Sequence, residues 1–389
     1  MDGSLFIASR LRFKGRIAIV CIAVSFLVMI VAVAISSGFR HEIRSSLSGI
    51  SGDVLISAPD MNVMSESRPI DFSSPCFDYV EQSASVSGTV PVVWRAGIVR
   101  HDDNMHGVVL KGVPSEGSSR DTVSLGVSIP RRLALAAGLE PGDRMQTWFI
   151  GEDMKVRQFN VTDVYDAIVE TEDRHVVYAS LEDMQRLNGW DDDQVSAVEV
   201  HLSEGLVSED DIRNATQEIG ALISLYHPDE DIIATSSVSR FPQLFNWLSL
   251  IDFNVGIILL LMTIVAGFNM ISGLLIMLFE HISTIGLLKS LGMTDRSIAK
   301  VFLTSSAVLV GKGMLAGNLL ALMFCLIQGT THFLRLDPEN YYVSFVPVKV
   351  DVLMILSADL IAFAAIMLLL LIPCLFISKV DPADTVRVR

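Results

Sequence analysis

Few residues of this chain are of a type and spacing that could do chemistry. His101 and His106 flank Asp102-Asp103, and Asp191-Asp192-Asp193 follow Trp190. Imidazole and carboxylate groups are common metal ligands, so either group could hold an ion. The alternative is a solvated turn in an acidic segment, and that is the interpretation we favour. We therefore predict no metal site.

Catalytic motifs are also missing from the sequence. It contains no HExxH, no GxSxG and no Walker A pattern. Gly311-Lys312-Gly313 lacks both the upstream glycine and the following Ser/Thr that a phosphate-binding loop needs. We expect no catalytic residues, no enzymatic activity and no cofactor bound by this chain itself.

Charge is distributed unevenly along the 389 residues. The net charge is −15, yet the segment 41–252 alone carries 35 Asp+Glu against 15 Lys+Arg, a net of −20, so the remainder carries +5. Nucleic-acid binding needs clustered Lys and Arg, and this acidic balance argues against it. Of the four cysteines, three lie in apolar runs, so Cys76 has no disulfide partner within the acidic segment.

Four apolar runs are long enough to cross a bilayer as helices, which takes about 20 residues. They are Ile17–Ile35, Val255–Phe279, Val301–Gln328 (interrupted only by Lys312) and Val352–Ile377 (interrupted only by Asp359). The first run could be a signal peptide, because Ala32-Val33-Ala34 resembles a cleavage site. Its apolar core is longer than the 7–15 residues typical of such signals, so we predict four spans.

Basic residues near the ends of the spans predict their orientation, since Lys and Arg concentrate on the cytoplasmic side. Such residues precede the first span, occupy the loop after the second and follow the fourth (Arg10, Arg12, Lys14, Arg16; Lys289, Arg296, Lys300; Lys379, Arg387, Arg389). The predicted segments are 1–16 cytoplasmic, 17–40 transmembrane, 41–252 periplasmic domain, 253–279 transmembrane, 280–300 cytoplasmic loop with a short helix, 301–328 transmembrane, 329–351 periplasmic loop, 352–377 transmembrane and 378–389 cytoplasmic tail.

Polar and small residues inside the spans suggest packing or gating roles. Asn269 needs a partner in hydrocarbon, and Gly313 with Gly317 forms a small-xxx-small pair for close helix contact. Lys312 and Asp359 must be paired or face water. At 1.5 Å per helical residue their depths differ by roughly 11–14 Å, which disfavours direct pairing. A partner subunit or water in a cavity are the alternatives.

The segment 41–252 has an α+β pattern. β-branched stretches at 53–57, 108–110, 176–179 and 197–202 read as strands, and 145–150 follows a turn at 138–143. Helices are expected at 131–137, at 180–187 with Ser180 as N-cap, and at 210–226.

The stretch AGFNMISGLLIMLFEHISTIGLLKSLGMTDRSIAKVF (266–302) resembles the core of FtsX-like ABC transporter permeases, and more narrowly the lipoprotein-releasing permeases LolC and LolE. Further stretches resemble that group in the same order along the chain: FIASRLRF (6–13), SSGFRHEIRSSLSGISGDVLIS (36–57), VVLKGVP (108–114), LALAAGLEPGDRM (133–145), FPQLFNWL (241–248) and VDPADTVR (380–387).

The resemblance implies a multi-pass protein of the bacterial inner membrane with a periplasmic α+β domain of the MacB-like periplasmic core type. It implies a separate cytoplasmic ABC ATPase that binds ATP and Mg, and a second permease, either identical or related. The substrates would be lipid-modified proteins, passed to a periplasmic lipoprotein chaperone. The alternatives are another FtsX-like exporter of a peptide, lipid or drug, and a scaffold that regulates cell-wall hydrolases.

Particular residues would carry these roles. Apolar residues at 282, 285 and 288 form a helical stripe in the inner loop. We therefore expect the ATPase contact at Ile285, Leu287, Leu288, Lys289 and Leu291, with Gly292 as the turn; the alternative is an interfacial helix without a partner. Candidates for lipid contact flank the emergence of the first two spans (Phe39, Ile43, Phe241, Leu244, Phe245, Trp247), where membrane-interface anchoring is equally plausible. A chaperone-binding loop is expected at Ala167–His175.

Overall fold

The computed structural model describes residues 16–61, 68–101, 104–114, 125–149, 154–166, 175–203, 208–226, 231–337, 341 and 343–374. They form two compact units. The helical unit comprises Met1–His41, Trp247–Arg335 and Phe345–Arg389, and the α+β unit comprises Glu42–Asn246 and Leu336–Ser344. The short Leu336–Ser344 segment thus belongs with the α+β unit although it lies in the loop between the third and fourth spans.

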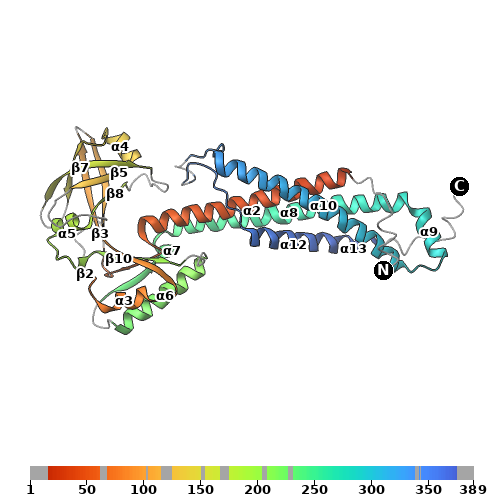
Figure 1. Ribbon diagram of the computed structural model, residues 1–389, viewed down its shortest axis with the longest axis horizontal. Helices are drawn as coiled ribbons and strands as arrows, with labels where there is room; N and C mark the ends of the chain where they lie inside the picture. Colours follow the sequence, from red (N-terminus) through yellow and green to blue (C-terminus); the bar gives the residue numbers. More distant parts are fainter. Residues whose placement is uncertain are drawn as a thin grey trace. The chain divides into compact units, whose positions relative to one another are not determined.

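Four helices of the described chain are long and apolar enough to cross a membrane (Figure 1). They are α2 (Arg16–Ser51), α8 (Pro242–Glu280), α10 (Asp295–Thr331) and α12 (Val352–Leu369), the last followed by α13 (Leu371–Cys374). Each of the first three extends beyond its apolar run. The predicted fourth span at 352–377 is interrupted at Leu370, because Pro373 cannot donate to the carbonyl four residues earlier and its ring clashes there.

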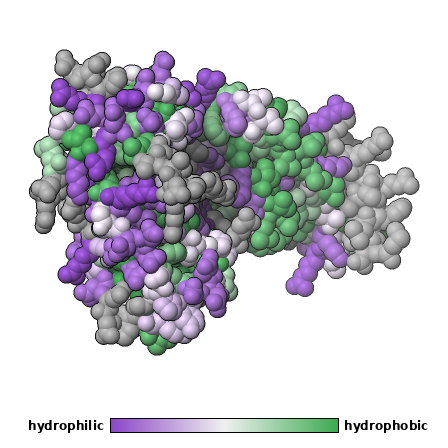
Figure 2. Space-filling view, turned by 60° about the vertical axis from the view of Figure 1, so that its left-hand side comes forward, coloured by the Kyte–Doolittle hydropathy of each residue, from purple (hydrophilic) through white to green (hydrophobic). Residues whose placement is uncertain are grey.

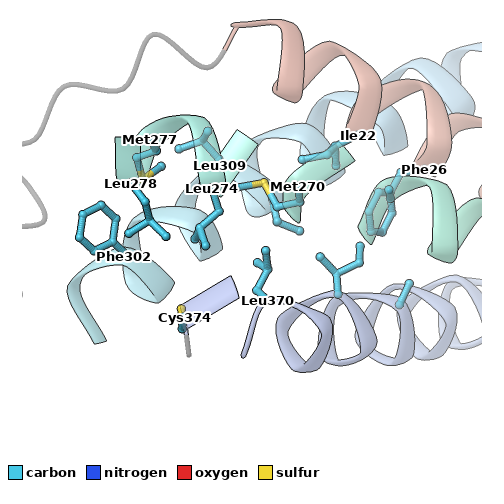
Figure 3. Close-up of a cluster of buried hydrophobic side chains, with 14 of the residues drawn as sticks. Ile22, Phe26, Met270, Leu274, Met277, Leu278, Phe302, Leu309, Leu370 and Cys374 are labelled. Atoms are coloured by element: carbon cyan, nitrogen blue, oxygen red, sulfur yellow. The ribbon is translucent and has the colours of Figure 1, made fainter. Parts of the chain in front are cut away.

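The helical unit is held together by an apolar core to which all four long helices contribute (Figure 3). Ile22 and Phe26 of α2 meet Met270 and Leu274 of α8, with further side chains from α10, α12 and α13. The outside of the unit is also apolar, as the continuous green surface in Figure 2 shows. A bundle that is apolar both inside and outside suits hydrocarbon rather than water.

The α+β unit contains eleven strands within the described residues: β1 (Val54–Ser57), β2 (Ile70–Asp71), β3 (Val86–His101), β4 (Asn104–Val113), β5 (Gly126–Pro130), β6 (Arg144–Phe149), β7 (Lys155–Tyr165), β8 (His175–Ser180), β9 (Gln194–Val195), β10 (Ala197–Leu202) and β11 (Ile233–Ser236). Its helices are α3 (Pro75–Glu81), α4 (Arg131–Ala137), α5 (Leu181–Asn188), α6 (Glu209–Tyr226) and α7 (Ser237–Arg240). The predicted α+β class is confirmed for this unit.

One long strand organises the main sheet, whose order is β11-β1-β10-β3-β4-β8-β5-β7-β6. The first half of β3 pairs with β10, and its second half pairs with β4 on one side and with β6 on the other. The pairing of β3 with β6 closes six strands into a barrel, which leaves β11, β1 and β10 as an open extension. The unit therefore has two lobes that share β3.

Local sequence explains several elements. The expected helix 131–137 is α4, which ends at Gly138 with φ 67°, the left-handed conformation that glycine adopts without strain. Ser180 is the N-cap residue of α5, and β10 spans the expected 197–202. The amphipathic helix α6 buries Ile212, Ala215, Ile219 and Ile223 at helical spacing.

Candidate functional site

The segment between α8 and α10 folds as a short helix, α9 (Ile282–Ser290). Ile285 on its inner face is 1% exposed and belongs to the apolar core of the helical unit, against which Leu288 also packs. On the opposite face Leu287 is 58% and Leu291 76% exposed. We call Leu287 and Leu291 the exposed α9 face.

Two residues after α9 fix the turn into α10. Gly292 has φ 87°, which only glycine adopts readily. Thr294 then caps α10 by accepting a hydrogen bond from the Ser297 amide. Lys289 forms a 2.9 Å ion pair with Asp295, and its side chain is 10% exposed. The turn thereby holds the exposed α9 face away from the core.

The six residues predicted for ATPase contact therefore divide. Leu287, Leu291 and Gly292 are at the surface. Ile285 differs from them, because its side chain is 1% exposed and packs in the apolar core of the helical unit, and its contact with the ATPase stays a prediction. Leu288 and Lys289 are half-buried and serve the turn itself.

Gly313 and Gly317 lie where α10 meets α2. A Cβ atom on Gly313 would stand 2.6 Å from Ile22 Cγ2, and one on Gly317 would stand 2.5 Å from the Ala23 carbonyl oxygen. Both distances are below any real Cβ contact, so these positions admit only glycine at this helix separation. Asn269 lies half-buried on α8 next to Met270 of the core.

The two charged residues inside the spans do not pair. Lys312 is exposed on α10. Asp359 of α12 is 6% exposed and accepts a hydrogen bond from the Asn318 amide of α10. The depth argument against a Lys312–Asp359 pair is thus supported. Asn318 was overlooked in the sequence, although an amide in an apolar run is the signal that drew attention to Asn269.

Aromatic and charged residues join the beginning of α8 to α2 within the helical unit. The Phe39 and Trp247 rings meet edge to face with centroids 5.5 Å apart. Arg40 forms an ion pair with Asp252, whose other carboxylate oxygen accepts a 2.5 Å hydrogen bond from Ser36. These contacts fix the separation of α2 and α8 at this level.

Most of the residues proposed for lipid contact are enclosed in this structure. Phe39, Ile43, Leu244 and Phe245 are each at most 8% exposed, whereas Phe241 and Trp247 are half-buried. Contact of these six residues with lipid stays a prediction.

A different apolar surface is open instead. Only 6% of the apolar window of α8 is buried, the smallest share among the four long helices. Its exposed side chains recur at helical spacing along one face, which we call the exposed α8 face: Leu250, Phe253, Ile257, Leu260, Leu261, Ile264 and Phe268. This face could not be predicted from the sequence, because α8 is apolar on all sides and has no amphipathic period.

The α+β unit contains a buried charge cluster next to the end of α2. Lys111 Nζ lies 2.7 Å from Glu199 Oε2 and donates to the Ile50 carbonyl at 2.8 Å. Arg240 Nη2 donates to the carbonyls of Ser51 and Gly52 at 2.7 and 3.1 Å. Two cations therefore bind the last carbonyls of α2, where the helix dipole is negative.

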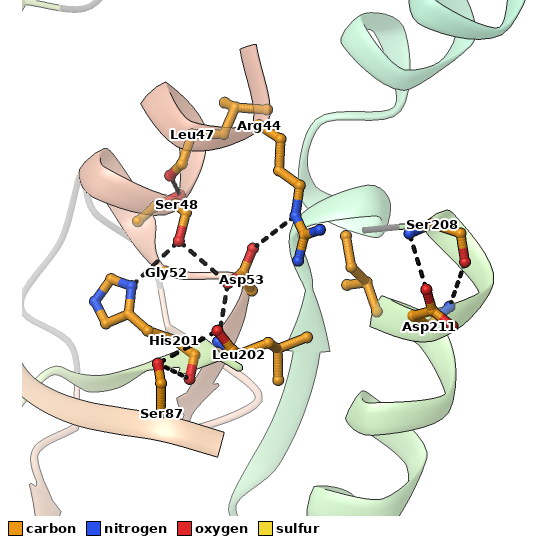
Figure 4. Close-up of polar contacts among 12 residues, drawn as sticks. Arg44, Leu47, Ser48, Gly52, Asp53, Ser87, His201, Leu202, Ser208 and Asp211 are labelled. Atoms are coloured by element: carbon orange, nitrogen blue, oxygen red, sulfur yellow. Dashed lines mark hydrogen bonds and ion pairs between the residues drawn. The ribbon is translucent and has the colours of Figure 1, made fainter. Parts of the chain in front are cut away.

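Asp53 provides a second connection between α2 and the sheet (Figure 4). Its carboxylate accepts from the Leu202 amide at 3.0 Å, from Ser48 Oγ at 3.1 Å and from Arg44 Nε at 3.4 Å. Ser48 also contacts His201 Nδ1 at 3.2 Å. Through these bonds the last two turns of α2 are fixed to β10.

Burial governs the protonation of the charge cluster. Desolvation raises the pKa of Glu199 to about 7, and the nearby Lys111 opposes that shift. Desolvation likewise lowers the pKa of Lys111 and lowers that of Arg240 to about 10. Each pKa shift has the direction expected for a charged group that burial removes from water and that neighbouring charges stabilise only in part.

The chaperone-binding loop and the cluster 101–106 considered in the sequence lie partly outside the described residues. Among the residues that the structure describes, no group of three or more His, Cys, Asp or Glu gathers as metal ligands would. The expected chaperone-binding loop Ala167–His175 lies outside the described residues except for His175, which begins β8.

The C-terminal part of the chain is similar to a known family. Residues 256–382, which run from α8 through α9, α10 and α12, match the family described as FtsX-like permease C-terminal. This part of the chain is similar to FtsX-like permease domains. The chain accordingly resembles the ABC transporter permeases of that type and is a multi-pass protein of the bacterial inner membrane.

Similarity extends beyond the FtsX-like domain. The lipoprotein-releasing system transmembrane protein LolC of Xylella fastidiosa strain Temecula1 is 23% identical over 402 residues, covering 96% of this chain and 94% of the relative. LolC of Neisseria meningitidis serogroup B is 22% identical over 408 residues with the same coverage. The likeness to these proteins thus includes the α+β unit and all four long helices.

Two solved structures are similar to part of the chain. The periplasmic region of MacB from Actinobacillus actinomycetemcomitans is 14% identical with a TM-score of 0.33, covering 50% of this chain and 92% of the solved chain. The extracellular domain of the ABC-type transporter YknZ from Gram-positive bacteria is 13% identical with a TM-score of 0.31, covering 47% and 99%.

Proposed function

We propose that this chain is the membrane subunit of an ABC transporter that releases lipoproteins from the inner membrane to a periplasmic chaperone. The observation that carries the proposal is similarity to LolC proteins along 96% of the chain, rather than in the FtsX-like domain alone. ATP and Mg would be bound by a separate ATPase subunit.

The proposed topology follows the positive-inside rule. Lys289, Arg296 and Lys300 beside α9 belong in the cytoplasm, and the acidic α+β unit belongs in the periplasm. In this arrangement the α+β unit is a periplasmic core of the MacB type. The connections of Asp53, Lys111 and Arg240 to the end of α2 would then transmit movement between the membrane helices and that core.

The exposed α9 face is the proposed contact with the ATPase. Leu287 and Leu291 expose apolar area that a partner would remove from water, at about 25 cal/mol per Å². A carboxylate in that contact would be buried without a counterion. Leu291→Asp should therefore abolish co-purification of the ATPase, whereas Leu135→Asp, at an exposed position of α4 in the α+β unit, should not.

One result of the co-purification experiment would contradict this proposal. If the ATPase co-purifies equally with Leu291→Asp and with Leu135→Asp, the exposed α9 face is not the contact with the ATPase. Because Leu291 packs against nothing in the described core, loss of folding should not complicate the comparison.

The exposed α8 face is the proposed site for apolar partners. Each buried CH₂ of an acyl chain contributes about 0.8 kcal/mol to membrane retention, so extraction needs both an apolar acceptor surface and ATP-driven work. Among the four long helices, α8 has the smallest buried share of its apolar window, and a second permease facing it would enclose a space for acyl chains.

Depletion of the protein in its native host tests the function. Membranes separated by density should show lipoproteins accumulating in the inner membrane and declining in the outer membrane. Unchanged lipoprotein distribution after depletion would overturn the lipoprotein-release proposal, and altered septation instead would point to regulation of cell-wall hydrolases.

A further inference from the structure

A buried acid–amide pair joins α10 to α12. Asn318 Nδ2 donates to Asp359 Oδ2, and Asp359 is 6% exposed. The second oxygen of each group, Asn318 Oδ1 and Asp359 Oδ1, is also buried and has no hydrogen-bond partner. Two unsatisfied oxygens thus belong to one pair of side chains that already share a hydrogen bond.

Among the described residues, none forms an ion pair that would balance an ionised Asp359. One helical turn away on either side of it, Ile355 and Ala362 lie in apolar clusters that include Ile30 of α2 and Ala321 of α10. The other charged residue inside a span, Lys312 of α10, is exposed and forms no ion pair with Asp359 in the described chain. A buried carboxylate without a counterion is strongly disfavoured in hydrocarbon.

A metal ion does not suit this position either. A hard cation needs about six or more oxygen ligands, and the pair offers two free oxygens. In the part of the chain that is described, no further His, Cys, Asp or Glu gathers there. A proton on Asp359 Oδ1 would pair both oxygens at once, because the acid O–H can donate and Asn318 Oδ1 can accept.

We propose that Asp359 binds a proton and that the resulting carboxylic acid forms a reciprocal, neutral hydrogen-bonded ring with Asn318. The acid O–H at Oδ1 donates to Asn318 Oδ1, while Asn318 Nδ2 donates to Asp359 Oδ2. A single proton taken from water removes the charge and pairs both unsatisfied oxygens. The ring is a polar connection between the two helices that flank the loop 332–351, and it is independent of the transported substrate.

Infrared difference spectroscopy of the full chain in lipid vesicles tests this directly. At pH 9 the exposed carboxyl groups among the 44 Asp and Glu are ionised, as is Glu199 with its pKa of about 7. The wild-type minus Asp359→Asn spectrum should contain the carbonyl band of a protonated carboxylic acid. A lost carboxylate band in its place would overturn the proposal.

Variants of the pair provide an independent readout. Asp359→Asn replaces the O–H by an N–H and keeps both hydrogen bonds, so its thermal midpoint in vesicles should stay near that of the wild type. Asp359→Leu and Asn318→Leu remove the ring and should lower the midpoint. An ionised or cation-binding Asp359 would instead make Asp359→Asn as harmful as Asp359→Leu.

A double variant in which the acid and the amide exchange positions tests the proposal even if a single variant does not fold. Asn318→Asp combined with Asp359→Asn moves the acid to α10 and preserves the ring, so the acid band should persist at pH 9. Its absence from both the exchanged pair and the wild type would overturn the proposal, as would a midpoint that rises with Na⁺ or K⁺.

Discussion

Removing Lys111 alone should destabilise the α+β unit severely. Its side chain is 3% exposed and lies 2.7 Å from Glu199, which is 1% exposed. Lys111→Met keeps the aliphatic stem but leaves a buried carboxylate whose other oxygen, Oε1, already has no partner. Breaking a buried pair in this way costs about 3–5 kcal/mol. The hydrogen bond from Lys111 to the end of α2 is lost as well.

Removing both partners should cost much less. Replacing a buried ion pair by apolar side chains of similar volume is often neutral, so Lys111→Met/Glu199→Met should recover most of the loss. Arg240 remains hydrogen-bonded to the carbonyls of Ser51 and Gly52 in the double variant, and it keeps α2 attached. The matched single variant, Glu199→Met, completes the thermodynamic cycle.

Hydrogen exchange of the full chain, read by mass spectrometry in peptides of β1, β4 and β10, measures this local stability. A loss of 3–5 kcal/mol corresponds to opening that is roughly a hundredfold to several thousandfold more frequent. The double variant should exchange at nearly the wild-type rate. If Lys111→Met leaves exchange unchanged, or if the double variant is as unstable as Lys111→Met, the assigned role of the charge cluster is wrong.

Two further predictions concern pH and helix packing. Burial raises the pKa of Glu199 from 4.5 to about 7, so the folded state holds this proton more tightly than the unfolded chain does. That stabilisation is complete below pH 4.5 and is lost as the pH rises to 7, by at most about 3 kcal/mol. Urea midpoints at pH 5 and pH 7.5 should show the decline, and Glu199→Gln should abolish it. In the membrane, Gly317→Ala should destabilise the bundle by about 1–3 kcal/mol because its methyl would strike α2. Gly311→Ala, which meets nothing within 4 Å, should be neutral; equal thermal midpoints for the two variants would contradict the tight α2–α10 contact.

Sequence patterns predicted the local elements because their causes are local. Long apolar runs predicted the four long helices, and amphipathic spacing predicted α6. Ser180 marked the beginning of α5. Turn residues around Gly138 marked the end of α4.

Local sequence patterns could not predict which strands and side chains pair when they are far apart in the chain. The strand β3 was not among the strands predicted from the sequence, and no local pattern shows that β6 pairs with its second half and closes a barrel. Lys111 and Glu199 are 88 residues apart, and nothing local connects them. The burial of Ile285 was missed because a short apolar stripe does not reveal whether it faces its own chain or a partner.

Cysteine labelling from one side of the membrane tests the central claim, that α9 faces the cytoplasm and the α+β unit the periplasm. In a background without Cys21, Cys76, Cys325 and Cys374, Ser290→Cys on α9 and Ser224→Cys on α6 would each place one exposed thiol. In intact spheroplasts a membrane-impermeant thiol reagent should label Ser224→Cys at once and Ser290→Cys only after permeabilisation. Labelling of Ser290→Cys in intact spheroplasts would contradict the account.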